Sequence, residues 1–357
     1  MALLAAAITA LCLWVLLTPP VLQALGRLRS DAKPAPLLAA FVLSGLVQWL
    51  RAWRFAVMTS GRPTLPDAPM VRIALKLNFL NFVLPFRLGE LGYPALMHQQ
   101  YGHGLLRSAG VLLLARLFDL TTVVAILLSA AALFLSGAAV QAAVLLAALG
   151  VALLPFAMVG LGAALLPRLG PRHAHPASPL TSSPARPERG WRLHMRLGSR
   201  LGRCQQAALG RSAHRGAPDA HWVAGLQAVL QGPMRLVVGL GFAIWLAFGL
   251  AAVLVAGAVV DTVAPSAALL GAAAGNIAFA LPVNGIAGLG PAQAAWVLAT
   301  TWAGVPRPDA IVSALALHAV VFANALLLGG LALGCGLGQR SGSGRRAALP
   351  DGPSRPN

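Results

Sequence analysis

Long apolar runs constrain what this chain can fold into more than any other feature of its sequence. Residues 105–135 are apolar at nearly every position, and residues 138–166 contain no charged side chain. A transmembrane helix needs about 20 consecutive apolar residues, so runs of this length predict membrane spans. Over the whole chain 58% of residues are hydrophobic and 10% are charged, whereas charged residues make up about 25% of soluble domains. The sequence therefore predicts an all-α polytopic membrane protein.

About six such runs predict full spans, at residues 2–25, 37–57, 105–135, 138–166, 233–260 and 309–337. The first run lacks the basic residues that precede the apolar core of a cleaved signal peptide. We therefore expect an uncleaved helix that bends or ends near Pro19 and Pro20, because proline cannot continue the hydrogen-bonding pattern of a helix.

Two further apolar stretches are interrupted. The first covers residues 70–84 and 88–99, and the second covers residues 265–281 and 291–301. Both have the pattern Phe-x-Leu-Pro before a polar break that contains glycine, at Pro85 and at Pro282. Proline ends a helix and glycine allows a sharp change of direction. Paired interruptions in corresponding places predict two re-entrant helix pairs in an inverted repeat, with a transporter-type site between them.

Positive charge is concentrated outside the apolar segments. The net charge is +18, and residues 167–222 are rich in arginine, proline and serine. We predict four regions: an N-terminal membrane half (1–166), a disordered basic loop (167–222), a C-terminal membrane half (223–338) and a disordered basic tail (339–357). The positive-inside rule places the loop and tail in the cytoplasm, next to anionic lipid headgroups. No module that reads nucleic acid accompanies the charge, so nucleic acid is not an expected partner.

The same rule gives a topology for the whole chain. With the loop and tail in the cytoplasm, the first re-entrant pair opens to the cytoplasmic side and the second to the opposite side. This count places Arg27, Arg29 and Lys33 outside the cytoplasm. The bias toward arginine, alanine, leucine and glycine suggests a bacterial chain, so we expect it in the inner membrane.

Ionisable residues within apolar segments are costly and indicate functional sites. Glu90 is one of nine acidic residues and lies three positions after Arg87. Arg116 and Asp119 lie three positions apart within an apolar run, so they share one helix face and can pair. Either arginine can contact a lipid phosphate, while the carboxylates neutralise the arginines or meet a cationic headgroup. The alternative is that Arg87–Glu90 and Arg116–Asp119 are structural ion pairs.

The second interruption supplies uncharged candidates for substrate binding. Its polar and glycine residues can present backbone groups to a substrate, and we select Asn284, Gly285, Gly288 and Gly290. His318, in the last apolar run, either faces the same site or packs in the core. At the end of residues 37–57, Arg51, Trp53 and Arg54 fit an interfacial anchor, and direct binding of lipid phosphate is the alternative.

Cofactor chemistry has little support in the sequence. Cys12, Cys204 and Cys335 are far apart, so neither a disulfide framework nor a metal site is expected. There is no phosphate-binding loop for a nucleotide. We therefore expect no catalytic residues, no metal and no cofactor.

Residues 85–90, followed by Arg-Leu-Phe-Asp at 116–119, resemble the lysylphosphatidylglycerol synthase transmembrane-region family. The glycine-rich residues 282–290 are similar to its second signature, and the similarity covers about residues 1–338. The resemblance implies a flippase-like membrane domain like the lipid-translocating half of the bacterial multiple peptide resistance factor. No stretch outside the predicted spans is long and ordered enough for the aminoacyl-transferring domain of full-length synthases, so lysine transfer is not implied.

This chain departs from the family pattern where the resemblance would place further charges. Family members often carry an arginine where this chain has Gly92-Tyr93-Pro94, and a glutamate where it has Ala115. A glutamate is also common at the position of Gln293, which we add to the substrate-binding candidates. This chain therefore has fewer charges at the presumed site than the family pattern implies.

The leading hypothesis is a translocase for a phospholipid or a polyprenyl-linked lipid. One alternative is a membrane-embedded transferase acting on a lipid carrier, although the chain has no DxD, HExxH or GxSxG motif. Another is an accessory subunit whose basic loop recruits a partner enzyme. A homo-oligomer is compatible with each of these hypotheses.

Overall fold

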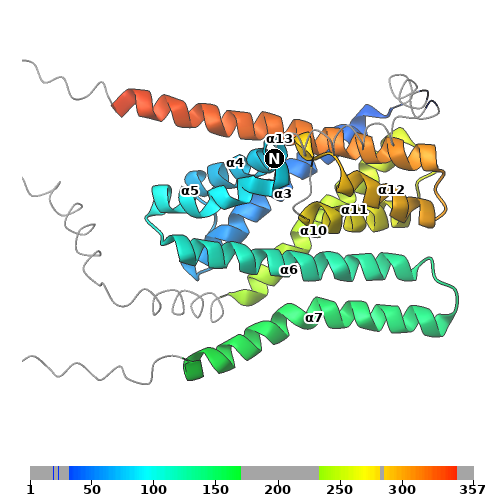
Figure 1. The fold of residues 1–357 in the computed structure, drawn as a ribbon, viewed down its shortest axis with the longest axis horizontal. Helices are drawn as coiled ribbons and strands as arrows, with labels where there is room; N and C mark the ends of the chain where they lie inside the picture. The colour runs from blue at the N-terminus through cyan, green and yellow to red at the C-terminus, as the bar shows by residue number, and fades with distance from the viewer. Residues whose placement is uncertain (1–18, 20–22, 24–31, 170–232, 282–284, 344–357) are drawn as a thin grey trace, which may run out of the picture.

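The computed structural model describes residues 19, 23, 32–169, 233–281 and 285–343, and this part of the chain is helical apart from short connections (Figure 1). The predicted all-α class is confirmed. The principal described helices are α3 (Pro34–Ser60), α4 (Ala68–Val83), η1 (Pro85–Leu91), α5 (Gly92–Tyr101), α6 (Leu105–Ala132), α7 (Ala138–Leu169), α10 (Met234–Val259), α11 (Pro265–Ala280), η2 (Ile286–Gly288), α12 (Pro291–Trp302) and α13 (Arg307–Ser343).

Five of the described helices are long and apolar enough to cross a membrane: α3, α6, α7, α10 and α13. They correspond to the predicted spans between residues 37 and 337. The predicted first span, the basic loop and most of the basic tail lie outside the described residues. The chain is therefore a multi-pass membrane protein.

Helices α3 and α10 run antiparallel and pack along one another. Lys33, just before α3, donates its backbone N–H to Ala258 near the end of α10 and pairs with Asp261 at 2.8 Å. Lys33 therefore lies at the end of the bundle opposite to the start of α10, which follows residues 170–232. Which of the two ends faces the cytoplasm stays a prediction, and Arg27 and Arg29 lie outside the described residues.

The two interrupted pairs extend inward from opposite ends of the bundle. In Figure 1, α4 and α5 lie toward the left end, and α11 and α12 lie toward the right end. Tyr101, at the end of α5, donates a hydrogen bond to Asp67, just before α4. At the other end, Thr262 precedes α11 and donates at 2.7 Å to Asp309, which follows α12. Each pair therefore starts and finishes at the same end of the molecule.

Apolar packing is concentrated toward the two ends of the bundle. One large buried cluster contains residues 52–58 of α3 and 234–240 of α10, together with parts of α4, α5 and α6. The other contains residues 251–256 of α10 with parts of α11, α12 and α13. Because α3 and α10 are antiparallel and run the full length, these clusters lie at opposite ends. The region between them, near the middle of α3, holds a smaller apolar cluster that includes Val47 and Ile244, and polar side chains also gather there.

Helix α7 packs along α6 and is otherwise mostly exposed. Residues 138–158 of this helix carry no charge, so their exposed surface is suited to contact lipid. Elsewhere, small residues allow helices to approach closely, as is common in membrane proteins. A Cβ at Gly329 of α13 would collide with the Cβ of Phe79 on α4, so only glycine fits at this crossing.

Candidate functional site

The first interruption places a carboxylate at the inner tip of the α4–α5 pair. Helix α4 ends where Leu84 adopts an extended conformation before Pro85, and the chain continues as the 3₁₀ helix η1. A Cβ at Gly89 would lie 2.6 Å from the backbone nitrogen of Asn81. Glycine at position 89 is therefore required for η1 to fold back on α4. This close approach positions the next residue, Glu90, against α6.

The second interruption is a tight glycine turn. Ala287, Gly288 and Gly290 have φ angles of 58°, 74° and 137°, which are strained for most residues other than glycine. The N–H of Gly285 donates to the carbonyl of Leu289, and the N–H of Gly290 donates to Oε1 of Gln293, both at 2.8 Å. The glycines thus shape the turn, and their predicted contact with substrate stays a prediction.

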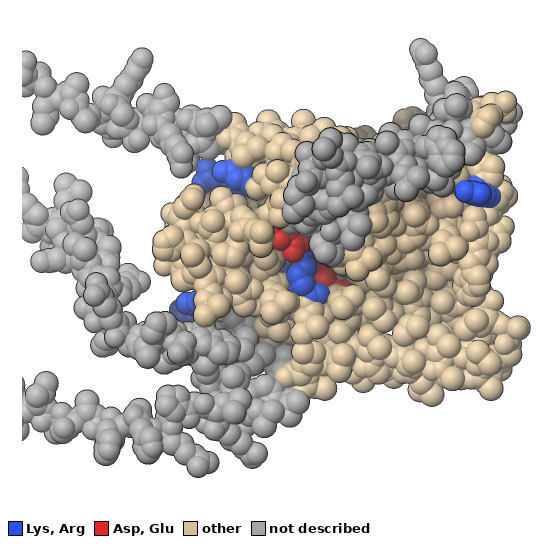
Figure 2. Space-filling view, in the orientation of Figure 1, with Lys and Arg blue, Asp and Glu red and all other residues tan. Residues whose placement is uncertain are grey.

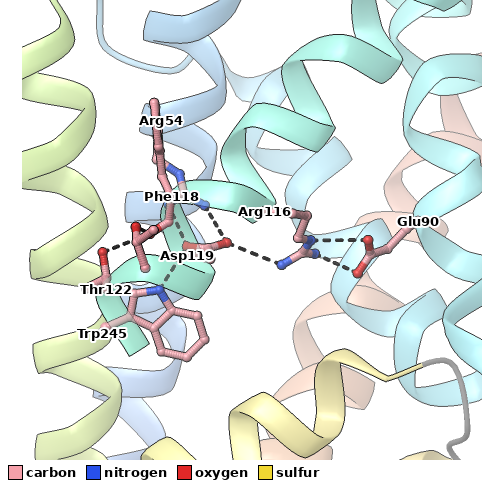
Figure 3. Close-up of polar contacts among 8 residues, drawn as sticks. Arg54, Glu90, Arg116, Phe118, Asp119, Thr122 and Trp245 are labelled. Atoms are coloured by element: carbon pink, nitrogen blue, oxygen red, sulfur yellow. Dashed lines mark hydrogen bonds and ion pairs between the residues drawn. The ribbon is translucent and has the colours of Figure 1, made fainter. Parts of the chain in front are cut away.

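A chain of four charged side chains joins the first interruption to the helix bundle (Figure 3). Arg116 of α6 pairs with Glu90 at 2.8 Å and, on its other side, with Asp119 at 3.4 Å. Asp119 also receives two hydrogen bonds from Arg54 of α3, at 2.7 and 2.9 Å, and one from the Trp245 indole of α10, at 2.8 Å. The predicted Arg116–Asp119 pair is therefore present within a larger network.

The interpretation of Arg54 as an interfacial anchor or a lipid-phosphate ligand was wrong. Its side chain is buried, with 1% exposure for the residue, and forms a bidentate pair with Asp119. Arginine near the end of an apolar helix often anchors that helix at the membrane interface. Arg54 instead pairs with a carboxylate of α6 inside the bundle. Arg51, one turn earlier, lies over the ring of Trp245 at 5.8 Å from the centroid.

A large cavity lies between the two interrupted pairs. This central cavity has a volume of about 1020 Å³, part of which is open to the outside. Gln48 and Arg116 line it and are near the middle of α3 and α6, so the cavity is half-way along the spanning helices. Figure 2 shows charged atoms of both signs in a hollow at the centre of a largely uncharged face. The polar lining consists of Ser44, Gln48, Arg51, Asn78, Asn81, Arg116, Asn276, Gln293 and His318.

A smaller side cavity of about 410 Å³ lies next to the central cavity. Both cavities are lined by Gln48, Arg51, Asn78, Asn81 and Arg116. The side cavity additionally contacts Glu90 and Arg54. The Arg116–Glu90 pair therefore lies between the central cavity and the tip of the first helix pair.

The opposite wall of the central cavity combines an amide, an imidazole and aromatic rings. Gln293 Nε2 and His318 Nδ1 are hydrogen-bonded at 2.9 Å. His318 also bonds to the backbone of Ala287 and stacks on Phe322 with ring centroids 5.9 Å apart. His318 therefore faces the cavity and is also hydrogen-bonded and packed against neighbouring residues. The two alternatives predicted from the sequence, a residue of the site and a packed residue of the core, are compatible.

The phenylalanines of the two Phe-x-Leu-Pro patterns meet at this cavity. The rings of Phe82 and Phe279 have centroids 5.7 Å apart. Gly288 in the second turn lies against Phe82, since a Cβ at this glycine would be 3.1 Å from its ring. The two interruptions are therefore in direct contact although they are about two hundred residues apart in the sequence.

The structure brings together several of the predicted site residues. Arg116, Gly288, Gln293 and His318 line the central cavity, Glu90 lines the side cavity, and Asp119 lies behind Arg116. Gly285 and Gly290 lie in the adjoining turn. Asn284 and the side chain of Arg87 fall outside the described part of the structure.

Sequence reasoning missed five polar residues of the cavity. Asn78 and Asn81 lie in α4 directly before the first interruption, and their spacing of three positions on an apolar helix was a usable signal. Ser44, Gln48 and Asn276 are isolated polar positions on α3 and α11. Only the packing of these helices shows that they face one site.

The fold and the cavity define a multi-pass helical membrane protein with a polar site between two interrupted helix pairs. A family model described as the lysylphosphatidylglycerol synthase TM region matches residues 2–329, which is nearly the whole chain. The chain belongs to this family, and the resemblance inferred from its sequence is confirmed. No match was found among curated proteins or among solved structures.

Proposed function

We propose that this protein moves a polar lipid or a lipid-linked substrate between the two leaflets of the bacterial inner membrane. The observation that carries the proposal is the polar central cavity half-way along the spanning helices. A lipid headgroup cannot cross hydrocarbon unaided, because removing charged and polar groups from water is costly. A cavity with arginine, amide and imidazole groups at this depth replaces part of the lost hydration.

The partial opening of the cavity also fits this role. A headgroup would occupy the cavity while the acyl chains stay in the surrounding lipid. The cavity is partly open, which a substrate with a headgroup inside and tails outside requires.

The arrangement of the two interrupted pairs supports an inverted repeat. The pairs extend from opposite ends of the bundle (Figure 1), and equivalent phenylalanines, Phe82 and Phe279, meet between them. In transporters with inverted repeats, substrate binds at the junction and the repeats move against one another to expose it to each side in turn. We propose the same mechanism here, with each pair re-entrant from its own side of the membrane.

The Arg116–Glu90 pair is the element best placed to respond to substrate. It joins the tip of the first pair to α6, and its side chains are 31% and 20% exposed. A substrate phosphate that enters the central cavity can compete with Glu90 for Arg116. Releasing Glu90 would then free the tip of the first pair to move.

The test is a leaflet-exchange assay with purified protein in liposomes that contain fluorescent phospholipids and polyprenyl phosphates. A reductant added outside quenches only dye in the outer leaflet, so exchange appears as loss of protected signal. We expect wild-type protein to accelerate this loss over protein-free liposomes, and Glu90→Gln to remove the acceleration without reducing membrane insertion.

Asp261→Asn is the matched control, since it makes the same chemical change in an exposed pair with Lys33. It should keep wild-type exchange. No acceleration by wild-type protein with any of these lipids would reject the proposal and bring the transferase and accessory-subunit hypotheses forward. If Glu90→Gln fails to fold, the pair is structural.

A further inference from the structure

The sign of the charge in the central cavity restricts what can bind there. Among the described residues that line it, the charged side chains are Arg51 and Arg116, and none is aspartate or glutamate. A bound molecule would therefore contact positively charged and neutral side chains in the described lining of the central cavity.

The nearest carboxylates are already engaged on the far side of Arg116. Glu90 contacts the Arg116 guanidinium at 2.8 and 3.1 Å. Asp119 accepts bonds from Arg54 and Trp245 in addition to its contact with Arg116. Three arginines against two carboxylates leave this region with one net positive charge. In the described lining of the central cavity, an ammonium group would meet two guanidinium groups and no carboxylate.

The remaining polar lining is dominated by side-chain amides, namely Gln48, Asn78, Asn81, Asn276 and Gln293. An amide group both donates and accepts hydrogen bonds, so it matches hydroxyl groups, which do the same. Arginine matches phosphate through its fixed set of N–H donors. Together these groups fit a phosphate that carries a hydroxyl-rich substituent.

We propose that the substrate is an anionic lipid in which a phosphodiester carries an uncharged, hydroxyl-bearing group such as glycerol or a sugar, and that cationic amine headgroups are disfavoured. This inference rests on the proposed translocation function. The physical reason is that an amine in the central cavity loses water without gaining a counter-ion, whereas a phosphodiester gains one.

The test compares headgroups in the leaflet-exchange assay, with the dye on the acyl chain or polyprenyl tail. Phosphatidylglycerol, phosphatidylinositol and a sugar-linked polyprenyl phosphate are compared with phosphatidylethanolamine and lysyl-phosphatidylglycerol. We expect exchange of the hydroxyl-bearing lipids to be about tenfold faster than exchange of the amine-bearing lipids, which corresponds to about 1.4 kcal/mol. Comparing phosphatidylglycerol with the sugar-linked polyprenyl phosphate shows whether the preferred substrate is a glycerophospholipid or a polyprenyl-linked lipid, since both carry a phosphate with a hydroxyl-bearing group.

Equal rates, or faster exchange of the amine lipids, would overturn this inference and leave translocation standing. No exchange of any lipid would reject the proposed function instead. Native mass spectrometry of the purified protein with the same lipids then decides the headgroup preference without transport. If the protein retained the hydroxyl-bearing and the amine-bearing lipids equally in the mass spectrometer, the inferred headgroup preference would be overturned.

Substitutions in the cavity lining test whether the headgroup preference arises in the central cavity. Arg51→Gln removes one positive charge from the lining and should lower the ratio of phosphatidylglycerol to phosphatidylethanolamine exchange several-fold. Arg62→Gln makes the same change at an exposed turn between α3 and α4 and should keep the wild-type ratio. Asn276→Asp adds a carboxylate to the lining and should also lower the ratio. An unchanged ratio in both Arg51→Gln and Asn276→Asp would contradict the inference.

Discussion

Two carboxylates that look alike in the sequence have different surroundings in the folded protein. Asp119 is 5% exposed and is bound by Arg54, Arg116 and Trp245 from three helices. Glu90 is more exposed and is carried by the tip of an interrupted pair. A buried, multiply bonded pair fixes helices in place, whereas a partly hydrated pair can exchange partners at lower cost.

Replacing Asp119 should destabilise the fold. Asp119→Asn leaves Arg54 charged and buried without a counter-ion, which costs about 3–5 kcal/mol in comparable buried pairs. The measurement is thermal unfolding of the purified protein in detergent, where the midpoint should fall clearly below that of wild type. Asp261→Asn, at the exposed pair with Lys33, should leave the midpoint nearly unchanged. A wild-type midpoint for Asp119→Asn would show that the network does not stabilise the fold.

At the scale of helices, the sequence predicted the described elements well. Apolar length identified the spans, and proline with glycine identified both interruptions, because these are properties of a local stretch. The pairing of Arg54 with Asp119 was not predictable in this way. The two residues are 65 positions apart, and Trp245 is a further 126 positions from Asp119. Their contact depends on how three helices pack.

The fold of the first interruption should depend on Gly89. In Gly89→Ala the new methyl group would meet the backbone of Leu80 and Asn81 at 2.6 Å, so η1 must move away from α4. We expect a lower thermal midpoint and weaker leaflet exchange. Gly110→Ala is the matched control, because a Cβ at this exposed position in α6 has no neighbour within 4 Å. Equal effects of the two substitutions would contradict the close packing of η1.

At the scale of the whole molecule, two large apolar clusters lie at opposite ends, and the middle contains the polar cavity and a smaller apolar cluster around Val47 and Ile244. Helices α3 and α10 run through both clusters, and each cluster contains helices of one interrupted pair. Each interrupted pair is therefore packed mainly within its own cluster, and the two pairs meet at the central cavity.

The most direct test of the account is to fill the central cavity and measure lipid exchange. Val321→Trp adds bulk to the cavity wall on α13. Leu331→Trp makes a matched change on the same helix at a position that is 59% exposed. Both proteins are compared with wild type in the liposome assay at equal protein content. We expect Val321→Trp to lose most of the exchange and Leu331→Trp to keep it. Wild-type exchange by folded Val321→Trp would show that the substrate does not pass through this cavity.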